Sequence, residues 1–120
     1  MNPQEVARTY IDTWNATDPA RRTRLLQAGW NERARYADPL MSGDGREQID
    51  RLVAGVHERF PGFRFALLGT PDGHGDHVRL AWSLGPEGAE PPIKGSDVIE
   101  LQEGRIARVI GFLDQVPATA

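Results

Sequence analysis

The stretch DGREQIDRLVAGVHERFPGFRFALL, residues 44–68, contains the change of pattern that decides the fold. In its first half, apolar residues recur at the spacing that places side chains on one face of a helix, namely Ile49, Leu52, Val53, Val56 and Phe60. Asp44 with Glu47 is typical of a capping pair at a helix start, and Pro61 with Gly62 ends the helix. Residues 63–68 are rich in β-prone side chains. The stretch therefore predicts a helix followed directly by a strand.

The residues before this stretch predict two more helices and a short strand. The first helix has an apolar face formed by Val6, Ala7, Tyr10, Ile11 and Trp14, and Asn2 caps it. Asp18 with Pro19 starts a second helix, which Gly29 ends. Residues 30–38 alternate with a period of two and predict a strand, and the turn formers at 42–45 predict a loop.

The residues after it predict antiparallel strands. A turn at residues 72–76 precedes a strand in which Val78, Leu80, Trp82 and Leu84 alternate with polar residues. Residues 93–101 and 105–113 make a second hairpin. A chain whose helices come first and whose antiparallel strands come later is typical of the α+β class, in which one face of a sheet folds over a layer of helices. We expect residues 1–120 to form a single domain.

Composition excludes several classes of function. The chain has no cysteine, which excludes disulfides, thiolate nucleophiles and cysteine-bound metals. Its net charge of −3 argues against a nucleic-acid partner, and no apolar run approaches the ~20 residues that cross a membrane. His74 and His77 lie in a glycine-rich turn without a third ligand, so we expect neither a metal nor another cofactor. A cytoplasmic location is the default expectation.

Three polar residues occupy positions where the pattern expects apolar ones. Asp38 shares a strand face with Tyr36, Asp97 is in register with apolar residues of the second hairpin, and Tyr10 lies on the apolar face of the first helix. Burying a carboxylate is costly and shifts its pKa. If the sheet curls around the helices, all three side chains are expected to point into one cavity.

Five short motifs carry a resemblance to a known family. They are Tyr10-Ile11, Asp38-Pro39, the run GREQI at residues 45–49, Asp97-Val98, and Gly104-Arg105-Ile106. In order and spacing they resemble ketosteroid isomerase, and the whole chain is similar to the SnoaL-like group of the nuclear-transport-factor-2-like superfamily. This resemblance implies a cone: a curved, mostly antiparallel sheet wrapped around the N-terminal helices and enclosing a pocket, in the cystatin-like α+β barrel class. It also implies a homodimer that forms through the exposed sheet face.

The resemblance also implies roles for the three polar residues. Asp38 matches the general base of the isomerase, Tyr10 matches its oxyanion-hole tyrosine, and Asp97 matches its protonated aspartic acid. Trp30 and Val53 stand at the nearest matching places for the tyrosines that support the oxyanion hole, so steroid specificity is not implied. A carboxylate base of this kind removes a proton from a carbon next to a carbonyl group, while neutral donors hold the enolate.

Aromatic side chains predict a pocket for a small apolar or aromatic ligand. The candidates for its lining are Trp14, Trp30, Tyr36, Phe65, Trp82 and Phe112, with Asp114 near the mouth. Three functions remain open at this point: a cofactor-free isomerase or cyclase acting by proton transfer on an apolar carbonyl compound, a non-catalytic ligand-binding or accessory domain, and epoxide hydrolysis. The last needs an arginine in the pocket, such as Arg79, although strand alternation places Arg79 opposite Trp82.

Overall fold

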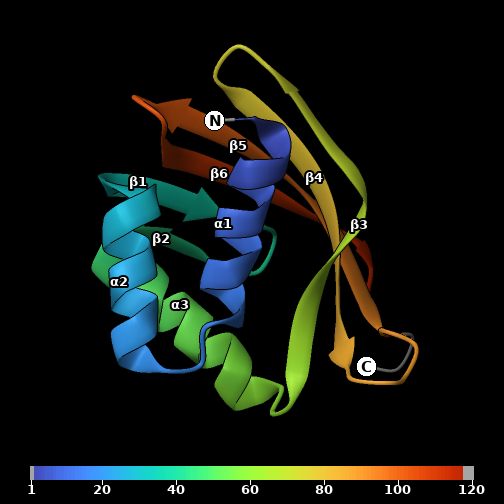
Figure 1. Cartoon of the computed structure of the whole chain (residues 1–120). Helices are drawn as coiled ribbons and strands as arrows, with labels where there is room; N and C mark the ends of the chain where they lie inside the picture. The colour runs from blue at the N-terminus through green and yellow to red at the C-terminus, as the bar shows by residue number, and fades with distance from the viewer. Residues whose placement is uncertain (1, 118–120) are drawn as a thin grey trace.

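Three helices pack on one side of a curved six-stranded sheet in the computed structural model, which describes residues 2–117 (Figure 1). The elements, in chain order, are α1 (Pro3–Asn15), α2 (Pro19–Gly29), β1 (Trp30–Ala37), β2 (Ser42–Asp44), α3 (Arg46–Arg59), β3 (Phe63–His74), β4 (His77–Pro86), β5 (Ile93–Gln102) and β6 (Arg105–Gln115). None of these helices combines the length and apolar character that crossing a membrane requires. The predicted α+β class is confirmed.

The starts of α1 and α2 follow the sequence signals. The Asn2 side chain accepts a hydrogen bond from the backbone N–H of Glu5 at 2.8 Å, and the Glu5 side chain accepts one from the backbone N–H of Asn2. This reciprocal pair is a capping box. Asp18 accepts the backbone N–H of Arg21 at 3.0 Å and caps α2. Both helix starts are therefore specified by local residues, as predicted.

The start of α3 differs from the prediction. Asp44 does not cap the helix; it ends β2, and its side chain lies 3.4 Å from Arg35 on β1. The N-cap is Gly45, which has a φ of 85° and offers no side chain. The predicted loop at residues 42–45 is also wrong, because residues 42–44 pair with β1. This short strand depends on a distant partner, so a local pattern does not show it.

The sheet is mixed and open. Its strand order is β2-β1-β6-β5-β4-β3, with β1 and β6 parallel and all other pairs antiparallel. The sheet therefore wraps around the helices without closing into a barrel. Register shifts interrupt β3 against β4 and β5 against β6, and such irregularities bend strands. Across the middle of the sheet, Asp97 on β5 lies opposite Leu80 on β4 and Gly111 on β6.

The second hairpin turns at two residues with positive φ, Glu103 at 53° and Gly104 at 78°. This combination belongs to the type I′ turn, whose twist matches that of the flanking strands. The first hairpin turns later than predicted, because β3 continues to His74 and leaves only residues 75 and 76 in the turn. The alternation along β4 is confirmed, since Val78, Leu80, Trp82 and Leu84 are all buried.

Candidate functional site

A large pocket lies between α1, α3 and the inner face of the sheet. Its volume is 670 Å³. Its wall is mostly apolar, and its polar members include the three residues singled out in the sequence: Tyr10, Asp38 and Asp97. The further lining residues are Ile11, Trp14, Tyr36, Leu40, Met41, Arg51, Leu52, Gly55, Val56, Arg59, Phe60, Phe65, Trp82, Leu84, Ile93, Leu113, Val116 and Pro117. The curvature of the sheet thus brings α1, the end of β1 and the middle of β5 to one cavity.

Asp97 is the most deeply buried carboxyl group of this pocket, with a relative exposure of 2%. Its Oδ2 accepts a hydrogen bond from the Tyr10 hydroxyl at 2.5 Å, while its Oδ1 has no hydrogen-bond partner among the described residues. Burial raises the pKa of Asp97 from 3.8 to about 6, against the opposing effects of Tyr10 and Trp82. The charge of Asp38 adds to this rise. Asp97 therefore exchanges its proton close to neutral pH.

Tyr10 is held rigidly behind Asp97. Its ring packs between Trp14 and Trp30, at centroid distances of 6.3 Å and 5.7 Å. Burial raises the pKa of Tyr10 well above 10.0, and the charge of Asp97 raises it further. The hydroxyl group therefore keeps its proton and remains a hydrogen-bond donor to Asp97.

Asp38 follows β1 directly and is fixed by three hydrogen bonds. Its Oδ1 accepts the backbone N–H groups of Leu40 at 2.8 Å and Met41 at 2.9 Å, and its Oδ2 accepts the Tyr36 hydroxyl at 2.6 Å. The backbone bonds form the local turn that an aspartate before a proline favours. Burial raises the pKa of Tyr36, so this hydroxyl also stays protonated. The arrangement orients a partly exposed carboxylate at the pocket wall.

Gly111 lies against both aspartates. A Cβ atom at this position would lie 2.8 Å from Asp97 Oδ1 and 3.2 Å from Asp38 Cβ. Both aspartates therefore border the same glycine, and the free oxygen of Asp97 lies on that side. A glycine inside a strand marks a close approach of this kind. Gly111 is a site residue that the sequence argument missed, and its position in the middle of an alternating strand was the available signal.

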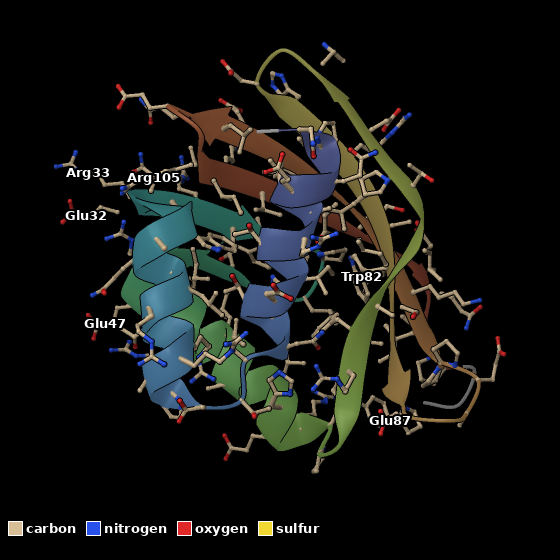
Figure 2. All side chains as sticks on the ribbon, viewed as in Figure 1. Glu32, Arg33, Glu47, Trp82, Glu87 and Arg105 are labelled. Atoms are coloured by element: carbon tan, nitrogen blue, oxygen red, sulfur yellow. The ribbon has the colours of Figure 1, made fainter. Side chains whose placement is uncertain are left out.

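Four of the predicted aromatic residues line the pocket: Trp14, Tyr36, Phe65 and Trp82. They form a continuous wall, because Trp14 contacts both Tyr36 and Phe65, at centroid distances of 5.2 Å and 5.6 Å. Phe65 in turn meets Trp82 edge-on at 5.4 Å. Figure 2 shows Trp82 on the inner side of the sheet, in the space between α1 and the strands β3 and β4.

Three predicted lining residues lie elsewhere. Trp30 is completely buried in the core behind Tyr10, where its indole N–H donates to Thr13 Oγ1 at 3.1 Å. Phe112 is 52% exposed, and Asp114 accepts a hydrogen bond from Ser96 on the solvent side. The last two point outward because Gly111 and Leu113, their neighbours on β6, occupy the inner face. Their expected place in the pocket wall is therefore corrected.

Arg79 also lies outside the pocket. Its guanidinium group forms two hydrogen bonds to Asp72, at 2.9 Å and 3.1 Å, on an exposed face. The epoxide-hydrolase hypothesis therefore loses the arginine that it named. Two arginines that sequence reasoning did not place in the wall, Arg51 and Arg59, reach the pocket from α3. Arg51 is paired with Glu47 at 2.8 Å.

The helix α3 contributes the largest group of lining residues that the sequence argument assigned to the core. The predicted stripe divides into two parts: Ile49 and Val53 are fully buried, whereas Leu52, Val56 and Phe60 are half-buried and line the pocket. Periodicity identifies the inward face of a helix but does not distinguish core from pocket wall. The prediction that this stripe faces inward is nevertheless confirmed.

Comparison with known proteins identifies the family of the chain. The model of the SnoaL-like domain matches residues 7–109. A solved structure of a proposed isomerase of the SnoaL-like family from Agrobacterium tumefaciens has 44% sequence identity and a TM-score of 0.89, covering 92% of this chain and 96% of that chain. A comparison with curated proteins finds no match.

Two more distant solved structures share the fold. A proposed ketosteroid isomerase from Kribbella flavida is 21% identical, with a TM-score of 0.71, covering 98% of this chain and 82% of that chain. A proposed SnoaL-like polyketide cyclase from Jannaschia is 18% identical, with a TM-score of 0.74, covering 98% and 93%. The predicted resemblance is thereby confirmed: the chain belongs to the SnoaL-like family and has the nuclear-transport-factor-2-like fold.

Proposed function

We propose that the pocket catalyses a cofactor-free proton transfer on a small, largely apolar carbonyl compound, as in an isomerisation or an aldol-type cyclisation. The observation that carries this proposal is the meeting of Asp38 and Asp97 across Gly111 in an apolar pocket. One carboxyl group is partly exposed and the other is buried, so their environments separate their roles. Paired groups of this kind are expected where a base and an acid act on one substrate.

In the first step, Asp38 is the base. Its carboxylate takes a proton from the carbon next to the substrate carbonyl, and the electron pair of the broken C–H bond forms the enolate. The three hydrogen bonds to Asp38 hold the carboxylate in one orientation before the substrate arrives. Such positioning lowers the barrier, because the reacting atoms need no further ordering.

Asp97 stabilises the oxyanion that develops during this first step. Its free Oδ1, when protonated, donates a hydrogen bond to the enolate oxygen, and burial favours that protonated form. Asp38 then returns the proton to another carbon, which completes an isomerisation. In a cyclisation the enolate carbon instead attacks a second carbonyl group, and the resulting alkoxide takes the proton from Asp38. Both routes balance without a cofactor.

The similarity to the Agrobacterium protein supports the reaction class, since that protein is described as a proposed isomerase. The same geometry would also serve a domain that binds a ligand without chemistry. An experiment on proton exchange separates the two, because only the enzyme needs Asp38 to act as a base.

The test follows the exchange of α-protons of β-tetralone, an apolar ketone whose carbonyl lies in a ring fused to benzene, in heavy water by proton NMR. We expect the wild-type protein to accelerate this exchange and Asp38→Asn to slow it by ~10²–10⁴-fold, the usual contribution of a general base. The affinity for the ketone, measured by quenching of tryptophan fluorescence, should remain unchanged. Asp12→Asn is the matched control, because Asp12 is an exposed aspartate on α1 that does not line this pocket.

Two outcomes would count against the enzyme. If the folded wild-type protein binds the ketone without accelerating exchange, the pocket is a binding site. If Asp38→Asn accelerates the exchange of the ketone protons as much as the wild type does, another group is the base and the assignment of Asp38 is wrong.

A further inference from the structure

Three buried side-chain atoms in residues 2–117 have no hydrogen-bond partner in the protein: Trp14 Nε1, Trp82 Nε1 and Asp97 Oδ1. All three belong to residues that line the pocket. Folded proteins leave few buried polar atoms unpaired, and each one requires an explanation. Two of these atoms, Trp82 Nε1 and Asp97 Oδ1, belong to neighbouring side chains, because Trp82 lowers the pKa of Asp97.

Trp82 is positioned next to Asp97 by the strand pairing. It lies on β4 opposite Gly95 on β5, and a side chain at Gly95 would overlap the Trp82 indole. Asp97 is two residues further along β5, so it faces the same side of the sheet. Gly95 therefore lets the indole lie flat against β5, beside the carboxyl group of Asp97.

Tyr10 is less suited to contact a ligand than the family resemblance implies. Its hydroxyl proton is engaged with Asp97 Oδ2, and its ring is enclosed between two tryptophans with 1% exposure. Turning the hydroxyl toward a ligand would break that bond. Trp14 is a weaker candidate too, because its indole N–H lies near the enclosed Tyr10 oxygen, whereas that of Trp82 lies near Asp97, whose Oδ1 is unpaired.

We propose that Trp82 Nε1–H and Asp97 Oδ1 together bind the oxygen atom of the ligand, and that Tyr10 is a positioning residue that fixes Asp97. This inference rests on the proposed function in that it takes the ligand to be a carbonyl compound that passes through an enolate. It assigns to Trp82 the selection of ligands that carry an oxygen acceptor at the deep end of the pocket. An indole N–H only donates, so it favours a negatively charged oxygen over a neutral one.

The test measures equilibrium binding in the Asp38→Asn protein, so that no turnover contributes. Two probes of nearly the same shape are compared: β-naphthol, whose neutral hydroxyl oxygen is a hydrogen-bond acceptor, and naphthalene, which lacks an oxygen. We expect Trp82→Phe to lower the affinity for β-naphthol about tenfold at a pH of about 5, where Asp97 holds its proton. The affinity for naphthalene should fall far less, because the phenyl ring retains much of the apolar contact.

Trp30→Phe is the matched control, because Trp30 is a core tryptophan whose N–H already has a partner. We expect it to leave the preference for β-naphthol over naphthalene unchanged. Tyr10→Phe should also keep this preference at low pH. However, the preference should then be lost at a higher pH than in the parent protein. The reason is that the Tyr10 hydrogen bond lowers the pKa of Asp97, so its removal raises that pKa.

Several outcomes would overturn the assignment. If Trp82→Phe lowers the affinity for β-naphthol and naphthalene equally, Trp82 has a packing role only. If Trp14→Phe instead lowers the affinity for β-naphthol alone, the Trp14 indole is the donor. Absence of any preference for β-naphthol in the parent protein would also refute it. None of these results depends on proton exchange, so failure of the proposed reaction and failure of this inference are distinguishable.

Discussion

Replacing Asp97 with asparagine is expected to remove a pH-dependent loss of stability from the folded protein. The pKa of Asp97 is 3.8 in ordinary surroundings and about 6 in the fold, mainly because of burial. The folded chain therefore binds this proton more tightly than the unfolded chain. The resulting stability is fully present below the unfolded value and is lost as the pH rises through the folded one. At about 1.4 kcal/mol per pKa unit, the loss amounts to about 3 kcal/mol.

The assay is urea unfolding of the wild type and Asp97→Asn at several pH values between about 4 and 8. An asparagine carries no charge and still accepts the Tyr10 hydrogen bond through its carbonyl oxygen. Relative to the wild type, the free energy of unfolding of Asp97→Asn should therefore rise by about 2.5 kcal/mol across this range, with most of the change complete near pH 7. Taking the difference between the two proteins removes the contribution of other titrating groups.

Asp12→Asn provides the control, because Asp12 is an exposed carboxylate on α1. The difference in the free energy of unfolding between Asp12→Asn and the wild type should change little with pH. If the Asp97→Asn difference is equally constant, Asp97 titrates as a solvated group. In that case the argument for a buried acid in the pocket is wrong.

Two further changes test the packing and the orientation of the site. Gly111→Ala puts a Cβ atom 2.8 Å from Asp97 Oδ1 and should lower the free energy of unfolding by ~1–3 kcal/mol, whereas Gly55→Ala on α3 meets no atom within 4 Å and should raise it by about 0.5–1 kcal/mol. Urea unfolding measures both, and similar effects in the two variants would contradict the close approach at Gly111. Tyr36→Phe removes the donor to Asp38 Oδ2 and should slow the exchange of β-tetralone protons about tenfold at unchanged affinity. An equal loss of affinity would instead show that the Tyr36 hydroxyl binds the ligand and does not act through Asp38.

The fold was predictable where local chemistry and distant packing agree. The Asn2 and Asp18 caps, the alternation along β4 and the last hairpin all depend on residues close in sequence, and the structure confirms them. The exceptions depend on a distant partner. The β2 strand has only three residues and exists because Tyr36 and its neighbours on β1 pair with it. Its formation also takes Asp44 away from the helix start, which explains the wrong cap.

The site was less predictable, because a tryptophan or phenylalanine has the same pattern in a core and in a pocket wall. Trp14 and Trp30 both face inward, yet only Trp14 reaches the cavity, since Tyr10 separates Trp30 from it. Phe112 shows a different error. Its position in β6 places it on the outer face once Gly111 is known to face inward, but a glycine has no side chain to reveal its face.

The two strand glycines explain why the polar residues meet at all. Gly95 leaves room for the Trp82 indole, and Gly111 leaves room for the carboxyl group of Asp97 beside Asp38. A glycine inside a strand weakens it, since it has no side chain to pack and loses more backbone freedom on folding. At Gly95 a Cβ atom would also lie 2.6 Å from the backbone oxygen of Phe112 on β6, so both the neighbouring strand and the indole require a glycine there. At Gly111 the nearest atoms all belong to the side chains of Asp97 and Asp38. At that position the cavity, rather than the stability of the sheet, dictates the residue.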